Sequence, residues 1–557
     1  MSESAARQLA TELIGSLLAA DPFLGTGLGL REFDALLPDP SAAAEQALAV
    51  LIADLGARAA IATADGAADR VTLGVVRGVC ELRGLALANA SDEYTVTAMP
   101  ITGPPALLAA AARTVLVDER AATDYLARLR AAPAWIDGTA ERLREGRAKG
   151  RQPVGELVEQ AIAWADSTLA TPVPPAFLAP TAPPGWDGAD AWREQVAQVV
   201  SSDIAPALAR WRDLLVELRP HARSDEQVGL GSIPGGEEAY RRCIAVHTTL
   251  PLTADELHRT GLDAVAELEQ RALELGAPLG LNDLPEIVGA VRASSVDVDP
   301  QAAMAAAREA VQRAEARAGE MMPGPLPAPC AVEAMPATVG ESGMPPHYTR
   351  PRQDGSRPGT FWFNAHRATA GAGWDLEAVA FHEAVPGHHS QLARAQLLED
   401  LPLLQQVSIT VHSEGWGLYA ELLAGEFGLY SDAHAPLGAA FVAMHRACRL
   451  VVDTGLHAFG WSRTRAIEFM LEHVALPEGF LINEIDRYIA WPGQALAYLT
   501  GQREILRLRE QARLALGERF DLRSFHAALL DSGSVPMPVL AEIVTDWVAA
   551  RQVAAAG

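Results

Sequence analysis

The sequence predicts a mainly α-helical protein, and three observations support this. Apolar residues recur at helical spacing, separated by short turns, over residues 5–165. Alanine-rich runs at residues 106–117 and 301–318 favour helix because alanine has the highest helix propensity. Thr253 and Glu256 have the spacing of a capping box, so we expect a helix that begins there and runs towards Gly276.

The remaining elements follow in order along the chain. Turns at Asp21-Pro22 and residues 37–40 divide the first helical region. A proline-rich stretch, residues 171–185, predicts an extended connector between a possible N-terminal layer (1–170) and a possible second layer (186–557) of one family-wide unit. The Pro/Gly-rich residues 323–358 and the β-forming residues 359–364 predict a small antiparallel sheet. An apolar helix is expected over residues 403–430.

Composition limits the partners and the location that we expect. Lys and Arg number 45 against 70 Asp and Glu, and the net charge of −25 should repel nucleic acid and anionic membranes. The four cysteines are far apart and form no CxxC pair. The first residues lack a signal-peptide pattern, and no 18-residue run is apolar enough to span a bilayer. We therefore expect a cytoplasmic, reduced protein that binds neither nucleic acid nor membrane.

The motif His-Glu-Ala-Val-Pro-Gly-His-His at residues 382–389 predicts a metal site. Neutral imidazoles are preferred ligands of Zn²⁺, and a carboxylate beside a ligand is well placed as a general base. The apolar residues 376–381 predict a helix that carries His382 and Glu383 into the site. Ten of the 14 histidines lie between His347 and His473, which also favours a site in this region.

The spacing of the histidines departs from the His-Glu-x-x-His pattern by two inserted residues. His382 and His388 are six residues apart, which leaves them ~120° out of line on a straight helix. His389 is aligned but lies roughly 10 Å further along the axis. A bend at Pro386 and Gly387 would return His388 to His382, so we predict His388 as the second ligand and keep His389 as the alternative. The competing interpretation is a broken helix with hydrogen-bonded polar side chains.

A third ligand is expected from the helix at residues 403–430. Glu414 and Glu421 are seven residues apart and project from one helical face. We predict Glu414 as the ligand, because Gly415 and Gly417 allow another segment to approach closely, and Glu421 as the residue that orients a ligand. The opposite assignment, or ion pairs of both glutamates with arginines such as Arg446 or Arg449, stays open.

Three blocks of sequence resemble a known family. Residues 381–391, 414–421 and 487–495, with further similar stretches at 248–253 and 453–457, are similar to the signatures of the bacterial domain of unknown function 885. That family is remotely similar to helical Glu-zincin peptidases of the carboxypeptidase Taq and oligopeptidase types. The resemblance implies a helical fold around a deep channel, with one Zn²⁺ held by His382, His388 and Glu414 and with Glu383 as the base.

The same chemistry assigns further catalytic and substrate-binding roles. Glu383 would take a proton from the metal-bound water and pass it to the leaving amine. The oxyanion needs another donor, for which Tyr488 is our first candidate and His457 the second. Arg487, or else Arg449, could bind a substrate carboxylate. A buried packing or ion-pair role is the alternative for each of these four residues.

A substrate-binding strand is expected just before the motif. Residues 359–364 could form an edge strand that holds an extended peptide by main-chain hydrogen bonds, with polar contacts from Tyr348 and Asn364. A hairpin without a substrate role is the alternative.

Three interpretations of function remain in competition. The leading one is a zinc-dependent hydrolase of peptides or amide-bonded small molecules. The second is a metal-dependent biosynthetic or lyase-type enzyme, and the third is a non-enzymatic helical binding scaffold with a degenerate site. Iron or manganese would also suit two histidines and a carboxylate.

Overall fold

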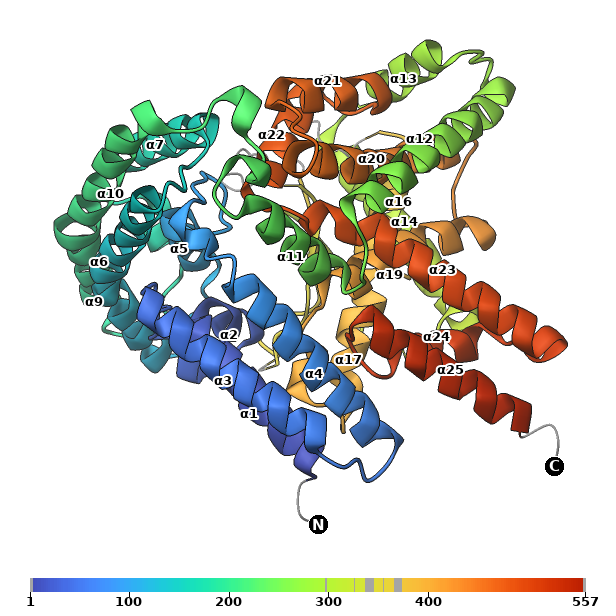
Figure 1. Cartoon of the computed structure of the whole chain (residues 1–557), viewed down its shortest axis with the longest axis horizontal. Coiled ribbons are helices and arrows are strands. Elements are labelled where there is room, and N and C mark those ends of the chain that lie inside the picture. The colour runs from blue at the N-terminus through green and yellow to red at the C-terminus, as the bar shows by residue number, and fades with distance from the viewer. Residues whose placement is uncertain are drawn as a thin grey trace.

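The computed structural model describes residues 4–295, 298–324, 326–335, 345–353, 355–364 and 373–553. Most of these residues are helical, which confirms the predicted fold class, and a small three-stranded sheet completes the fold. The helices pack around three separate hydrophobic clusters (Figure 1).

The first hydrophobic cluster joins the two ends of the chain. Its outer helices are α1 (Ala5–Ala20), α2 (Pro22–Leu28), α3 (Ala42–Ile61), α4 (Ala67–Leu87), α23 (Ala497–Leu516), α24 (Leu522–Leu530) and α25 (Met537–Val553). Helices α4 and α25 are in contact, and a Cβ on Gly78 would lie 2.8 Å from the Pro536 ring. The N-terminal and C-terminal helices therefore lie side by side at the bottom of Figure 1.

The second cluster lies above them in Figure 1. It is built from α11 (Gly236–Thr248), α12 (Ala254–Gly276), α13 (Leu284–Ala293), α20 (Ala435–His457), α21 (Arg463–His473) and α22 (Glu478–Ala490). The predicted capping box is present: the Thr253 side chain accepts from the Glu256 amide, and the Glu256 carboxylate accepts from the Thr253 amide. Helix α12 ends at Gly276, as the sequence predicts.

The third cluster forms the left-hand side of Figure 1. Its helices are α5 (Gly103–Arg113), α6 (Glu119–Ala148), α7 (Gly155–Leu169), α8 (Pro175–Leu178), α9 (Ala189–Val199) and α10 (Ala205–Leu218). The proline-rich stretch contains α8, so it is not extended throughout. Residues on both sides of this stretch, such as Ile162 and Trp192, share the same cluster.

The central helices complete the first cluster and carry the residues of the motif at 382–389 and Glu414. They are α14 (Pro300–Met321), α16 (Leu376–Glu383), α17 (Arg394–Leu397), α18 (Leu403–Gln406) and α19 (Thr410–Glu426). The single helix predicted over residues 403–430 is wrong, because the C-terminal segment interrupts it. Ser534 donates its amide to the Gln405 carbonyl and accepts the Ile409 amide on its hydroxyl.

The sheet consists of β1 (Ala331–Ala334), β2 (His347–Thr349) and β3 (Thr360–Phe363) in the order β1-β3-β2. Strand β2 is antiparallel to β3 but β1 is parallel to it, so the predicted antiparallel sheet is a mixed one. The predicted edge strand is also corrected. Strand β3 is central, because its apolar Phe361 and Phe363 are buried, and β2 is an outer strand of the described sheet.

Among the described residues, α20 is the one helix that is long and apolar enough to qualify as a membrane span. In this structure 78% of its most apolar window is buried. Packing in a protein core requires the same composition.

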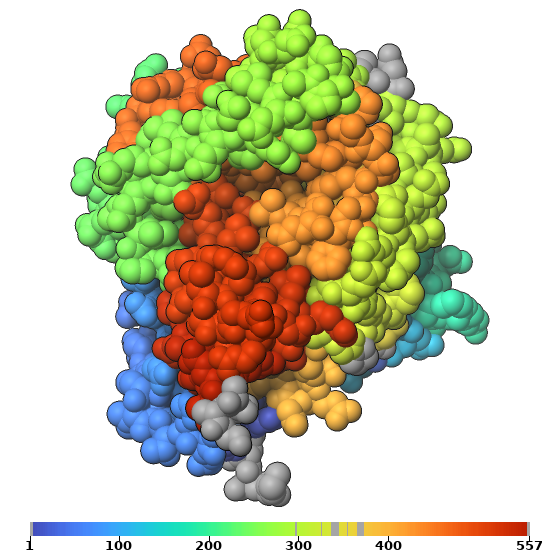
Figure 2. All heavy atoms as spheres, turned by 90° about the vertical axis from the view of Figure 1, so that its right-hand side faces the viewer, coloured from blue at the N-terminus to red at the C-terminus, as the bar shows by residue number. Residues whose placement is uncertain are grey.

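Figure 2 shows another face of the molecule, on which the C-terminal helices are red, α14 is yellow-green, and α12 and α13 are green.

Candidate metal centre

The bend predicted in the motif brings His388 back to His382. Helix α16 ends at Glu383, and after a turn the chain continues from His388 into a π-helical segment (His389–Ala393). The Trp416 indole donates to the carbonyls of Pro386 and Gly387 and fixes the turn. A Cβ on Gly387 would lie 1.9 Å from the His382 carbonyl oxygen, so only glycine permits this close return.

Two glycines of α19 make room for neighbouring segments, as the sequence predicts. A Cβ on Gly417 would lie 2.5 Å from the His382 imidazole. A Cβ on Gly415 would lie 2.5 Å from the backbone of Gly501 in α23. The first contact seats the His382 ring directly against α19, and the second holds α19 against α23.

Three potential ligand atoms converge at this point. Glu414 Oε2 lies 3.4 Å from His382 Nε2 and 3.5 Å from His388 Nε2, and the atoms of the trio lie within 4.8 Å of one another. Ligands bonded to one tetrahedral Zn²⁺ at ~2.1 Å are separated by roughly 3.4 Å. The predicted ligand set His382, His388 and Glu414 therefore has a spacing that fits Zn²⁺.

The alternative ligand His389 points elsewhere. Its Nδ1 accepts a hydrogen bond from the Tyr348 hydroxyl at 3.0 Å, and its Nε2 donates to the Ala328 carbonyl at 2.7 Å. Both ring nitrogens are therefore occupied. By contrast, Nδ1 of His388 is buried and has no hydrogen-bond partner among the described residues.

Glu421 takes the predicted orienting position. Its Oε1 lies 2.7 Å from His382 Nδ1. A carboxylate only accepts, so Nδ1 carries a proton, and Nε2 is the ring nitrogen that faces Glu414. Among the described residues, neither Glu414 nor Glu421 forms an ion pair with Arg446 or Arg449, so the proposed alternative of two arginine pairs is wrong.

The charges of the cluster favour a cation between its members. Burial would lower the pKa of His382, but hydrogen bonds to Glu414 and Glu421 outweigh it and raise the pKa to about 9. Burial would raise the pKa of Glu414, but the two imidazoles hold it well below its usual range. Two carboxylates thus stabilise positive charge at the imidazoles, which is also the requirement for holding a divalent ion.

Glu383 lies beside this cluster and is 9% exposed. Burial raises its pKa, against smaller lowering effects from His388 and His382. A carboxyl group with a raised pKa is suited to accept and return a proton near neutral pH. Its position therefore agrees with the predicted role of a general base.

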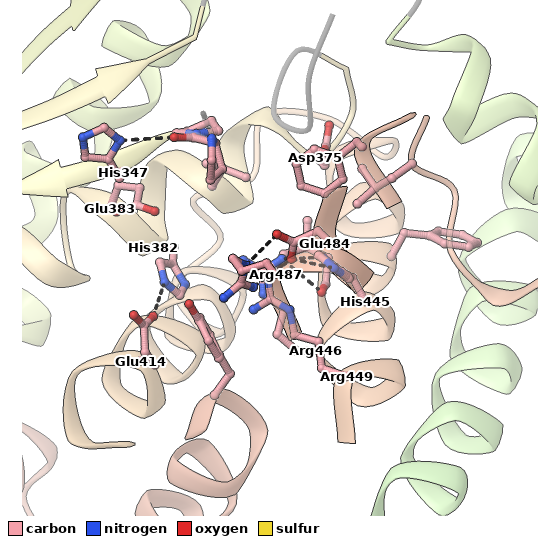
Figure 3. A pocket seen from close by; sticks show the side chains of 18 of the residues that line it. His347, Asp375, His382, Glu383, Glu414, His445, Arg446, Arg449, Glu484 and Arg487 are labelled. Carbon is pink, nitrogen blue, oxygen red and sulfur yellow. Dashed lines mark hydrogen bonds and ion pairs between the residues drawn. The ribbon is translucent and has the colours of Figure 1, made fainter. Parts of the chain in front are cut away.

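A cavity of about 360 Å³ opens next to the cluster, which is within the size range of small-ligand sites. In Figure 3, His382, Glu383 and Glu414 lie on one side of it, and Arg446, Arg449, Glu484 and Arg487 lie on the other. The first side belongs to α16 and α19, and the second belongs to α20 and α22. The deep channel implied by the resemblance is not confirmed.

Helix α20 makes a tight contact with Trp374, which lies two residues before the start of α16. A Cβ on Gly438 of α20 would lie 2.2 Å from the backbone of Trp374. Helices α16 and α20 are also in direct contact.

Tyr488 and His457 do not have the positions expected of oxyanion donors. The Tyr488 hydroxyl accepts from Arg449 Nε and donates to Glu484, each at 2.8 Å, and Tyr488 does not line the cavity. His457 accepts from the Leu230 amide and donates to the Tyr488 carbonyl, both at 3.1 Å. Both side chains are held in the core, so their predicted catalytic roles are corrected.

Tyr498 of α23 lines the cavity, and sequence reasoning missed it. Burial raises the pKa of its hydroxyl, and the charge of Glu414 raises it further, which places Tyr498 near the cluster. Its hydroxyl is 3.4 Å from the Gln494 amide nitrogen. The sequence contained one signal for Tyr498: it lies one helical turn after Gln494, which follows Gly493 in the block at residues 487–495.

The predicted substrate-binding residues differ in position. Tyr348 and Arg487 line the cavity, whereas the buried Asn364 is not among the lining residues. The donors of Arg487 are already used: Nε and Nη2 donate to Glu484 at 2.9 Å, and Nη1 donates to Gln494 at 2.6 Å. Arg487 therefore shapes the wall and is poorly placed to bind a substrate carboxylate.

Comparisons with known proteins agree with the fold. The family of bacterial proteins of unknown function called DUF885 matches residues 22–544. A "putative lipoprotein" from Colwellia psychrerythraea has 26% sequence identity and a TM-score of 0.90, with 98% of this chain and 99% of that chain covered. A second protein so described, of unknown function and from Shewanella oneidensis, has 17% identity and a TM-score of 0.74, with 98% and 100% covered. No curated protein matches.

The descriptions of these two relatives bear on location. Both call the proteins lipoproteins, which gives no support to our expectation of a cytoplasmic protein. The cytoplasmic location stays a prediction from the sequence.

Proposed function

We propose that this chain, which belongs to the bacterial DUF885 family, is a divalent-metal-dependent hydrolase of peptide or other amide bonds. The observation that carries the proposal is a trio of potential ligand atoms within 4.8 Å of one another beside a buried glutamate, at the wall of a cavity. Zinc is the expected metal because two imidazoles and one carboxylate leave a fourth position for water, although the set also suits iron or manganese.

The ligands would be Nε2 of His382, Nε2 of His388 and a carboxylate oxygen of Glu414. A bound Zn²⁺ would lower the pKa of water and polarise the substrate carbonyl. Glu421 would keep His382 in the tautomer that presents Nε2.

The side chains around the ligands would carry the proton transfers. Glu383 would accept the proton of the attacking water and pass it to the leaving amine nitrogen, which breaks the amide bond. The Tyr498 hydroxyl would donate to the developing oxyanion, in place of Tyr488. Strand β2, whose His347 and Tyr348 line the cavity, would hold an extended substrate through its main chain.

Elemental analysis tests the metal requirement. Wild-type protein purified without added metal should contain about one Zn²⁺ per chain, and His382→Ala should contain none. His221→Ala is the control, because His221 is exposed and lies outside the cavity lining, and it should retain the metal. Wild-type protein that binds no divalent metal, even when Zn²⁺ is offered, would exclude the proposed function.

A further inference from the structure

The side of the cavity opposite the metal cluster is a buried network of arginines. Arg449 is 5% exposed and donates through Nη2 to Glu484 at 2.7 Å and through Nε to Tyr488. Arg487 donates to the same glutamate through two nitrogens. Arg446, one helical turn before Arg449 on α20, also lines the cavity.

Donors of two arginines remain unused in this network. Nη1 of Arg449 is buried and has no hydrogen-bond partner among the described residues, and the same is true of Nε of Arg446. Nη1 of Arg446 makes only long contacts, at 3.5 Å to the Val442 carbonyl and 3.4 Å to His445. Buried guanidinium donors without acceptors are costly, so their presence at a cavity indicates that a ligand supplies the acceptor.

The network also carries unbalanced positive charge. Three guanidinium groups line this side of the cavity; Glu484 pairs with those of Arg449 and Arg487, and no ion pair of Arg446 is seen among the described residues. His445 adds no charge at neutral pH, because burial and the charge of Arg449 lower its pKa to about 3. An anionic ligand group would balance the excess.

The unused donors lie close to the candidate catalytic groups. Arg446 and Glu383 line the same cavity. The Arg449 guanidinium lies 4.4 Å from the centre of the Tyr498 ring. An anion bound between these arginines would therefore occupy the same cavity as Glu383 and Tyr498.

We propose that Arg446 and Arg449 bind the free carboxylate of a small amide substrate. The inference rests on the proposed function and specifies its substrate class: a short peptide cleaved next to its C-terminal residue, or an N-acyl amino acid. A guanidinium matches the planar carboxylate. The cavity of about 360 Å³ holds a small molecule, and Phe441, Phe480 and Trp491 in its lining favour an apolar side chain on that residue.

Binding to metal-free protein tests the inference without requiring turnover. The probes are N-acetylphenylalanine and its primary amide, which differ in charge and little in shape, and calorimetry with chelator-treated protein gives both affinities. The acid should bind about 10–100-fold more tightly than the amide, because charge-assisted hydrogen bonds are roughly twice as strong as neutral ones. Arg446→Gln should abolish that preference, whereas Arg503→Gln, at an exposed arginine outside the cavity lining, should preserve it.

The test of the proposed function and the test of the carboxylate site can have different outcomes, so one can be excluded without the other. Equal affinity for acid and amide, or a preference that survives both Arg446→Gln and Arg449→Gln, overturns the carboxylate site even if the protein binds Zn²⁺ and cleaves amides. Arg446 has only long contacts, so its variant should fold even where Arg449→Gln disturbs the Glu484 pair. In metal-loaded protein, comparing N-acetylphenylalanine with acetylated peptides that end in phenylalanine distinguishes the two substrate sources by their relative kcat/KM.

Discussion

The two sides of the cavity use the same kinds of side chain in opposite ways. On the α16–α19 side, Glu414 faces two imidazoles whose Nε2 atoms converge on it. On the α20–α22 side, Glu484 faces two arginines, and their charges hold its pKa well below the usual range although burial opposes this. The first arrangement brings two Nε2 atoms and a carboxylate oxygen to one point, and the second uses most of its donors internally.

The histidines show the same difference. His382 and His388 each keep Nε2 pointed at the cluster, whereas His457 and His389 use both nitrogens in hydrogen bonds. Histidine content therefore does not distinguish the two kinds of site. The difference is whether Nε2 of the imidazole faces the cluster or is already used in a hydrogen bond elsewhere. The variants below test this difference.

The largest expected effect is at His388. His388→Ala should lose bound metal and almost all activity, because it removes one of three ligands. His389→Ala should retain the metal, since that ring is bonded to Tyr348 and Ala328. Metal content and amide turnover of the two variants give the answer, and the reverse pattern would exchange the ligand assignment.

The next effect is at Glu383. Glu383→Gln should keep one metal per chain and lower kcat by about 10²–10⁴-fold, because the amide cannot accept a proton. The control is Glu377→Gln, since Glu377 lies on the same helix but pairs with Arg313. Turnover at the wild-type rate in Glu383→Gln would remove this residue from the mechanism.

Substitution of Tyr498 should affect activity, whereas substitution of Tyr488 should affect stability. Tyr498→Phe should lower kcat by about 10²–10³-fold with little change in Tm, because its hydroxyl is the proposed donor to the oxyanion. Tyr488→Phe should instead lower the free energy of unfolding by about 1–3 kcal/mol, because it breaks buried hydrogen bonds to Arg449 and Glu484. Kinetics and thermal denaturation of both variants test this; a Tyr498→Phe protein with unchanged kcat contradicts it.

The smallest effect is expected at Glu421. Glu421→Gln should weaken metal affinity by about 10–100-fold, since it perturbs the orientation and basicity of His382 but leaves the ligands in place. Competition with a chelator of known affinity measures the change. Complete loss of metal would mean that Glu421 is itself a ligand.

The sequence predicted the parts that depend on local pattern. The capping box predicted where α12 begins, and Gly276 the direction in which it runs; the motif predicted His382 and His388, and the next apolar helix predicted Glu414. Gly415 and Gly417 could be interpreted because a glycine in an apolar helix indicates close approach. In these cases the residues that carry the signal lie within a few residues of the feature that they predict.

The sequence could not predict the parts that depend on tertiary contacts. The break between α18 and α19 is made by Ser534, more than a hundred residues away. Tyr488 and Tyr498 lie within the same region of sequence, and only packing shows that one faces the core and the other the cavity. The order of the strands likewise depends on which strand is covered on both sides.

Under the proposed function, the close contact of Gly438 with Trp374 would limit the length of the substrate that fits the cavity. The metal ligands stand on one hydrophobic cluster and the arginines on another, so the span between them is fixed by how closely α20 lies against the start of α16. One added methyl group at this point would push the two clusters apart. If the proposed function holds, relatives of this chain with a larger residue at this position should accept longer substrates.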